Sequence, residues 1–154
     1  MAEEEIRESE RKYRELFETI KDGVVATDLE GKILECNQAF LDMLKYSAAE
    51  IRKKRYQEIT PKKWHKMEDR IVAKQVKARG YSDEYEKEYI KKDGTVFPIS
   101  IRVWLKKDRE GKPVGMWAIV RDITERKKAE EALRKSEEEF RLAFENARLS
   151  LIHI

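Results

Sequence analysis

The chain has 154 residues, of which 42% are charged and 40% are hydrophobic. This length suffices for one domain with a hydrophobic core and some flanking helix. No apolar run approaches the ~20 residues of a membrane span, and the acidic N-terminus lacks the apolar segment of a signal peptide, so we expect a cytoplasmic protein. The single cysteine, Cys36, excludes an internal disulfide and a cysteine-based metal site. A formal net charge of +3, with acidic and basic residues interspersed, does not favour nucleic acid as a partner.

The first half of the chain predicts a helix, a hairpin and three further helices. Residues 3–20 form a predicted helix, because apolar and small residues recur in steps of three and four. The runs VVATD and KILEC predict two strands joined by a turn at LEGK. Asn37 is a predicted N-cap, and Ser47 with Glu50 matches a capping box. A longer helix is predicted for residues 62–79, ended by Gly80, with an apolar side formed by Trp64, Met67, Ile71 and either Gln75 or Val76.

The second half changes to a period of two and predicts three strands within residues 81–122. Turns are expected at KKDG (91–94) and REGK (109–112). In the middle strand the core-facing set is Phe97, Ile99, Ile101, Val103 and Leu105. Trp104 has the opposite parity, so we expect it on the outer face, either in a dimer surface or as a single partly exposed tryptophan. The predicted fold is therefore α+β, with one five-stranded antiparallel sheet, short helices on one face and helices at both ends.

A second amphipathic helix is predicted from Thr124 to residue 147. Its apolar seam is narrow and suits one partner helix, which predicts a coiled coil in a parallel homodimer. The expected dimer seam consists of Tyr13, Leu16, Ile20, Ala129, Leu133 and Phe140. SERKYRELFETI (9–20) is similar to SEEEFRLAFENA (136–147), and the matching aromatic spacing favours an internal repeat over shared helical composition. Residues 148–154 are then either the stub of a following repeat or a non-native tail.

Three segments together, in their order and spacing, resemble the PAS sensor-domain family. They are DGVVATDLEGKILECNQAF (22–40), KKDGTVFPISIRV (91–103) and GMWAIVRDITERKKAEEAL (115–133). The last segment contains the Asp-Ile-Thr motif with which PAS domains end their final strand and begin a signalling helix. The resemblance extends over about residues 10–135, most of the chain. It implies a linker helix at 1–20, a PAS domain at 21–123 and a signalling coiled-coil helix at 124–147.

The resemblance also implies a regulatory role. PAS domains commonly stand in tandem upstream of histidine kinases or diguanylate cyclases, bind a small molecule or a partner, dimerise, and pass a shift of the sheet into a coiled coil. Asp122 and Thr124 align with the family's signal-relay positions. Both residues can also serve as caps of a linker helix, and the two roles are compatible. A relay requires two arrangements of similar energy in the element that moves.

A ligand pocket is expected between the sheet and the helices. The residues predicted to form it are Phe40, Leu44, Ile59, Trp64, Met67, Ile71, Ile101 and Val103. The cofactor is unknown: most simply there is none, although a small-molecule ligand is compatible with the pattern. His65 is favoured as a structural histidine over a haem ligand, and Cys36 as a buried core thiol over a photoreactive cysteine.

No catalytic constellation is present, because the chain lacks both a recognisable Ser-His-Asp elbow and a phosphate-binding glycine loop. No metal cluster is expected either. The favoured interpretation is a sensor or dimerisation module of a two-component system that relays a change to a downstream signalling domain outside the chain. Two alternatives stay open: a haem- or flavin-binding redox or gas sensor, and a ligand-free protein–protein interaction module. The identity of the ligand, the output domain and the direction of the signal are not accessible from the sequence.

Overall fold

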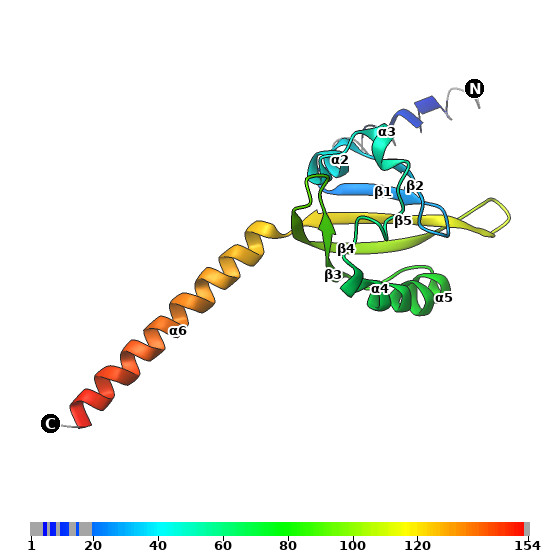
Figure 1. Cartoon of the computed structure of the whole chain (residues 1–154). Helices are drawn as coiled ribbons and strands as arrows, with labels where there is room; N and C mark the ends of the chain where they lie inside the picture. Colours follow the sequence, from blue (N-terminus) through cyan, green and yellow to red (C-terminus); the bar gives the residue numbers. More distant parts are fainter. Residues whose placement is uncertain (1–4, 6, 9, 13–14, 16–19, 153–154) are drawn as a thin grey trace. The chain divides into compact units, whose positions relative to one another are not determined.

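The computed structural model describes residues 5, 7–8, 10–12, 15 and 20–152. Its five strands form one sheet in the order β2-β1-β5-β4-β3, and every neighbouring pair is antiparallel (Figure 1). The strands are β1 (Gly23–Thr27), β2 (Ile33–Cys36), β3 (Tyr85–Ile90), β4 (Val96–Lys107) and β5 (Pro113–Asp122). This arrangement confirms the predicted five-stranded antiparallel sheet.

Helices connect the second and third strands. They are α2 (Gln38–Leu44), α3 (Ala48–Ile51), η1 (Lys62–Trp64), α4 (His65–Ile71), η2 (Val72–Val76) and α5 (Lys77–Arg79). The side chain of Asn37 accepts a hydrogen bond from the backbone N–H of Phe40, which confirms the predicted N-cap of α2. Ser47 and Glu50 form the predicted capping box of α3. Both caps stabilise short helices that would be marginal on their own.

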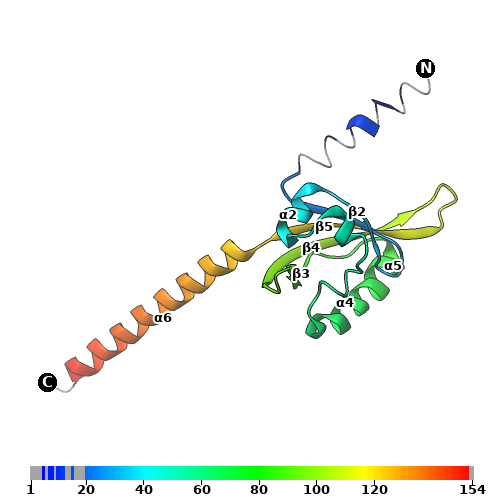
Figure 2. The ribbon, with the colours of Figure 1, turned by 45° about the horizontal axis from the view of Figure 1, so that its top comes forward.

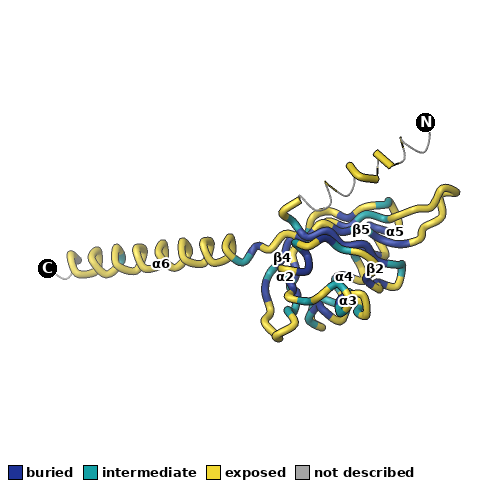
Figure 3. The backbone as a smooth tube through the Cα atoms, turned by 90° about the horizontal axis from the view of Figure 1, so that it is seen from above, coloured by how far each residue is buried: buried dark blue, intermediate teal, exposed yellow. Residues whose placement is uncertain are grey.

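The hydrophobic core lies between the sheet and these helices. Along β4 the predicted core residues Phe97, Ile99, Ile101 and Val103 are buried, and Leu105 is half-buried. They belong to one cluster with buried residues of α2, α3 and η2: Phe40, Leu41, Leu44, Ile51, Val72 and Val76. α3 and α4 lie on the same side of the sheet, and buried residues concentrate in its strands (Figure 3). The helices therefore cover one face of the sheet, as expected.

The predicted helical segment over residues 62–79 has the expected bounds, its end at Gly80 and its buried Val76, but it is not one regular α-helix and its other buried positions differ. The segment begins as the 3₁₀ helix η1, continues as α4, and passes through one π-helical stretch, η2, before it ends at Gly80. Its buried residues are Glu68, Val72 and Val76, whereas Met67 and Ile71 are only half-buried. A π-helix places more residues in each turn and so rotates the faces of the helix that follow. α4 and α5 lie alongside the β3–β4 side of the sheet (Figure 2).

The chain divides into two compact units, residues 1–122 and 123–154. In the first unit, the described residues between 5 and 15 are helical. The second unit contains α6 (Thr124–Ile152), so the helix continues beyond the predicted end at residue 147 into the segment expected to be a stub or tail. Among the seam residues, Ala129, Leu133 and Phe140 are exposed on α6, and Ile20 is exposed as well. Tyr13 and Leu16 lie outside the described residues.

Candidate functional site

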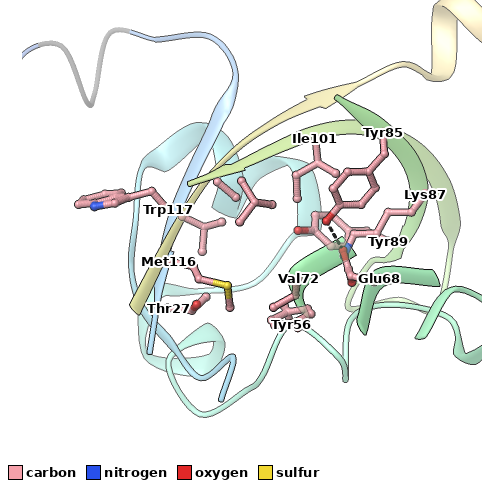
Figure 4. A pocket seen from close by; sticks show the side chains of 13 residues that line it. Thr27, Tyr56, Glu68, Val72, Tyr85, Lys87, Tyr89, Ile101, Met116 and Trp117 are labelled. Atoms are coloured by element: carbon pink, nitrogen blue, oxygen red, sulfur yellow. Dashed lines mark hydrogen bonds and ion pairs between the residues drawn. The ribbon is translucent and has the colours of Figure 1, made fainter. Parts of the chain in front are cut away.

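A small cavity lies between the inner face of the sheet and the α4–η2 segment. Its volume is about 30 Å³, which is room for one or two water molecules. Apolar side chains from β1, β4, β5 and η2 form most of its wall, and polar side chains from α4 and β3 form the rest (Figure 4). The lining consists of Val25, Thr27, Tyr56, Glu68, Val72, Tyr85, Lys87, Tyr89, Ile101, Val103, Met116, Trp117 and Ala118.

Two of the eight residues predicted to form the pocket line this cavity, namely Ile101 and Val103. Three others, Phe40, Leu44 and Ile59, are fully buried in the hydrophobic core instead. The last three, Trp64, Met67 and Ile71, are half-buried on the helical segment and do not line the cavity, because the buried face of that segment is the one with Glu68 and Val72. The lining of this cavity thus includes the two predicted residues of β4 and none of the other six.

The polar part of the cavity wall centres on a buried ion pair. The Nζ atom of Lys87 lies 2.6 Å from Oε1 of Glu68, and the two side chains are 0% and 4% exposed. Lys87 also donates a hydrogen bond of 3.0 Å to the hydroxyl of Thr60. The hydroxyl of Tyr85 donates a hydrogen bond of 2.7 Å to the other carboxylate oxygen of Glu68 (Figure 4). A buried pair of charges is stable only when further hydrogen bonds complete it, and these two bonds do so.

Two aromatic rings complete the surroundings of the Lys87 ammonium group. Its Nζ atom lies 4.7 Å from the ring centroid of Tyr89 and 5.3 Å from that of Tyr56, both within the range of a cation–π contact. Burial lowers the pKa of Lys87, and the carboxylate of Glu68 opposes that shift. Burial together with the negative charge of Glu68 raises the pKa values of the Tyr56, Tyr85 and Tyr89 phenols. These phenols therefore remain hydrogen-bond donors in any ordinary buffer.

The alternation of β3 brings this cluster together. Tyr85, Lys87 and Tyr89 lie at every second position of the strand and pair in register with Ile101, Ile99 and Phe97, which face the core. The sequence analysis missed both Glu68 and Lys87, because charged residues in the segments KKWHKMEDR and YEKEYIKK are normally solvated. One signal was available: Lys87 lies between two tyrosines that have the inward parity of the strand. We name Glu68, Lys87, Tyr85, Tyr56, Tyr89 and Thr60 the buried polar cluster.

The predicted relay residues lie at the end of the sheet. β5 ends at Asp122, which pairs in register with Ile99 of β4, and α6 begins at Thr124. One residue, Ile123, separates the two elements. Next to this point, Arg121 forms an ion pair of 3.1 Å with Asp22, just before β1. A single residue of chain thus joins the last strand of the sheet to α6.

The outer face of the sheet contains the predicted tryptophan. Trp104 pairs in register with Trp117 of β5, on the face opposite the core-facing residues, and it is half-buried, as its parity predicted. A groove of about 340 Å³ runs over this face, lined by Asp22, Glu84, Ser100, Ile101, Arg102, Trp104, Ile119 and Arg121. Its charged groups form two ion pairs, Glu84 with Arg102 and Asp22 with Arg121, and the hydroxyl of Ser100 also donates to Glu84. The role of this face in dimerisation stays a prediction.

His65 has the surroundings of a structural histidine. Its Nε2 atom lies 2.9 Å from the carbonyl oxygens of both Gln57 and Thr60, so this nitrogen must carry the proton that is donated to them. Cys36, at the end of β2, is half-buried and not fully buried as predicted. Within the part of the chain that the structure describes, no group of three His, Cys, Asp or Glu side chains could hold a metal ion. Among the same residues, no helix has the length and apolar character needed to cross a membrane.

A family model described as PAS domain matches residues 21–125. The chain belongs to the PAS domain family. The matched range includes all five strands, the connecting helices and the cavity with its polar cluster. The PAS domain of a protein from Colwellia psychrerythraea has the same fold, with a TM-score of 0.69 at 23% identity over 75% of this chain and 97% of that one.

Several curated proteins contain a segment similar to this PAS domain. The methyl sulfide methyltransferase-associated sensor of Methanosarcina acetivorans is 34% identical over 135 residues, 86% of this chain. Sporulation kinase C of Bacillus subtilis is 30% identical over 153 residues, 95% of this chain. The sensor histidine kinase TmoS of Ectopseudomonas mendocina is 28% identical over 131 residues, 85% of this chain. The chain spans only 13%, 35% and 14% of these three proteins, respectively.

Proposed function

We propose that this PAS domain is a regulatory sensor module of a longer cytoplasmic signalling protein, and that it relays a change in its sheet to an output domain such as a histidine kinase. The observation that carries this proposal is the connection between β5 and α6. The last strand of the sensor fold passes through a single residue, Ile123, into a helix of 29 residues whose side chains are almost all exposed. Relatives that are named as sensors or kinases also support a role in signalling.

The relay requires that α6 has a partner, and the proposed partner is α6 of a second copy. Ala129, Leu133 and Phe140 form a seam in steps of four and seven, and all three are exposed in the single chain. A second helix that covers these exposed leucine and phenylalanine side chains stabilises the dimer by roughly 25 cal/mol for each Å² of apolar surface removed from water. In the proposed parallel homodimer, Asp122 and Thr124 transmit a displacement of β5 to this seam. The module itself performs no catalysis in this proposal.

The outer face of the sheet is the second proposed dimer contact. Trp104, Trp117 and Ile119 give this face an apolar centre, with the ion pairs of Asp22, Glu84 and their arginine partners at its rim. An apolar centre with a charged rim is the usual composition of a protein interface. A tandem arrangement with further PAS repeats accords with the similarity of residues 9–20 to residues 136–147.

A haem or flavin sensor is the weaker candidate. A macrocycle or a flavin requires several hundred Å³, whereas the cavity has about 30 Å³. The Nε2 atom of His65 is also engaged with two carbonyl oxygens. A small ligand or a ligand-free interaction role fits the site better. An absorption spectrum of the purified protein between 300 and 700 nm tests for a chromophore. A Soret or flavin band would make the haem or flavin sensor the favoured function.

The seam is tested by Leu133→Glu, with Leu142→Glu as the matched control. The two leucines are similarly exposed, at 60% and 55%, but Leu142 lies on the opposite side of the helix from the heptad seam. We expect Leu133→Glu to weaken the dimer at least tenfold in sedimentation equilibrium and Leu142→Glu to leave it unchanged. In the full-length protein, Asp122→Ala should alter output without unfolding the domain. An unchanged dimer and unchanged output would refute the relay.

A further inference from the structure

The buried ion pair of the polar cluster joins two elements, the strand β3 and the helix α4. Lys87 and Tyr85 lie two positions apart on β3, and six register pairs bind this strand to β4. Glu68 comes from α4, which continues directly into the π-helical segment η2. Single π-helical turns inside α-helices occur frequently at functional sites. The two sides of the ion pair are thus held differently, one by a ladder of strand pairs and the other by a short helix.

The β3 side of the ion pair, formed by Lys87 and Tyr85, has the chemistry of a carboxylate receptor. An ammonium group and a phenolic hydroxyl converge on the two oxygens of one carboxylate, at 2.6 Å and 2.7 Å. Lys87 is fully buried and Tyr85 half-buried, and the cavity wall beside them includes the apolar side chains of Val72, Ile101 and Met116. Charge-assisted hydrogen bonds of this length are among the strongest in proteins, and low polarity around them strengthens them further. In the described structure, the carboxylate that fills this receptor is the protein's own Glu68.

We propose that the site formed by Lys87 and Tyr85 binds a small monocarboxylate with a short apolar chain, and that the ligand replaces Glu68. This inference rests on the proposed sensor function and names the ligand class for it. The carboxylate of the ligand takes the two hydrogen bonds that Glu68 now accepts. Its chain occupies the cavity beside Val72, Ile101 and Met116. Glu68 then leaves with α4, and the α4–η2 segment moves away from β3.

The opposite exchange, in which an amine replaces Lys87, fits the geometry less well. The ammonium group of Lys87 ends a fully buried side chain on a strand in the sheet, so its removal would require β3 to leave β4. Because Lys87 is held on a strand of the sheet, Glu68 is the group that is exchanged, and the ligand is therefore an anion.

The size of the cavity sets the scale of the ligand. About 30 Å³ is too little for a metabolite, so the ligand needs the space that Glu68 vacates in addition. Competition with a tethered carboxylate weakens binding, because an intramolecular partner acts at an effective concentration in the millimolar range or above. We therefore expect weak binding to the native chain and at least tenfold tighter binding once Glu68 is shortened.

The direct test is chemical rescue of Glu68→Ala by acetate. The substitution deletes a CH₂–COO⁻ group, and acetate restores the same atoms. We expect the variant to be destabilised in sodium chloride and to regain thermal stability in sodium acetate at equal ionic strength. Acetamide and methylammonium chloride, which lack a carboxylate, should restore nothing. The double variant Glu68→Ala/Lys87→Met should not respond to acetate, since the ammonium group that binds it is gone.

Two further measurements keep the test decisive. If Glu68→Ala does not fold in chloride, the yield of refolded protein in acetate against chloride becomes the readout. In the native chain, sodium butyrate should shift the methyl NMR signals of Val72, Ile101 and Met116 in a saturable manner, while butyramide should not. Equal rescue by acetate and acetamide, rescue without Lys87, or unshifted cavity methyl signals would each overturn the proposal.

These results are separable from the test of the relay. If carboxylates bind as described but Leu133→Glu and Asp122→Ala leave the dimer and the output unchanged, the relay fails and the ligand class stands. If the seam and relay variants behave as expected but no carboxylate binds, the sensor function stands with a different ligand.

Discussion

Replacing Lys87 by methionine tests the energetic role of the buried ion pair most directly. Methionine keeps an unbranched apolar stem but removes the charge and both hydrogen bonds to Thr60 and Glu68. Glu68 then keeps a buried carboxylate that accepts a hydrogen bond from the hydroxyl of Tyr85. Because the two side chains of the pair are 0% and 4% exposed, solvent cannot screen the remaining charge. Breaking such a pair costs about 3–5 kcal/mol of unfolding free energy.

That loss is a large part of the ~5–15 kcal/mol by which a domain is normally stable. With a urea m-value of about 1–3 kcal/mol/M, the unfolding midpoint should fall by more than about 1 M. The measurement is urea unfolding followed by circular dichroism. Lys106→Met is the matched control, because the ammonium group of Lys106 also lies over an aromatic ring, that of Trp117 at 5.2 Å, but the residue is exposed. We expect this control to lose less than ~1 kcal/mol.

The double variant Glu68→Leu/Lys87→Met tests whether the cost of Lys87→Met comes from leaving the buried charge of Glu68 unpaired. Replacing both charges with apolar groups of similar volume is commonly neutral or stabilising by about 1–4 kcal/mol. We therefore expect the double variant to be at least as stable as the native chain. The ion pair does not have this energetic role if Lys87→Met costs no more than Lys106→Met, or if the double variant is as unstable as the two single variants combined.

Two further predictions concern a glycine turn and an exposed carboxylate. Gly31→Ala should destabilise the fold more than Gly111→Ala in the same urea assay. Both glycines have positive φ, so both substitutions strain the backbone. An added Cβ at Gly31 would also lie 2.5 Å from the Tyr56 ring, whereas at Gly111 it would meet nothing within 4 Å. The hydrogen bond from Lys92 is the main cause that lowers the pKa of Glu50 to about 2, so Lys92→Met should raise this pKa towards 4.5 in a carbon-13 NMR titration.

The sign of the pH effect follows from the lowered pKa of Glu50. A carboxylate with a folded-state pKa below its unfolded value of 4.5 stabilises the fold above pH 4.5 and loses this contribution as the pH falls towards 2. Lys92→Met should therefore make stability less dependent on pH in this window. An unchanged Glu50 titration in the variant would contradict the assignment, and equal destabilisation by the two glycine substitutions would exclude the clash with Tyr56.

Local patterns sufficed where the responsible interactions are local. The N-cap at Asn37 and the capping box of Ser47 and Glu50 connect residues three positions apart, so the sequence predicted them correctly. The inward set of β4 followed from the period of two, because a strand with one buried face must alternate. The place of Trp104 on the outer face followed from the same parity.

The helical segment before β3 shows where local patterns were insufficient. A regular helix over residues 62–79 with Met67 and Ile71 inward matches the hydrophobic period, yet the structure buries Glu68 and Val72. The free energy of burying Glu68 is favourable only because Lys87, nineteen positions later, arrives at 2.6 Å from the adjacent strand. The sequence pattern around either residue does not reveal that the two side chains meet.

The sequence by itself thus determined the order of the elements, their turns and caps, the core face of the long strand and the membership of the PAS family. These features depend on interactions within a few residues or on the periodicity of one element. The tertiary structure alone decided the buried polar cluster, its small cavity and the face that α4 turns inward. A charged side chain is stable in the interior only when its partner is brought there by the fold, so its position depends on the packing of two elements and not on either one.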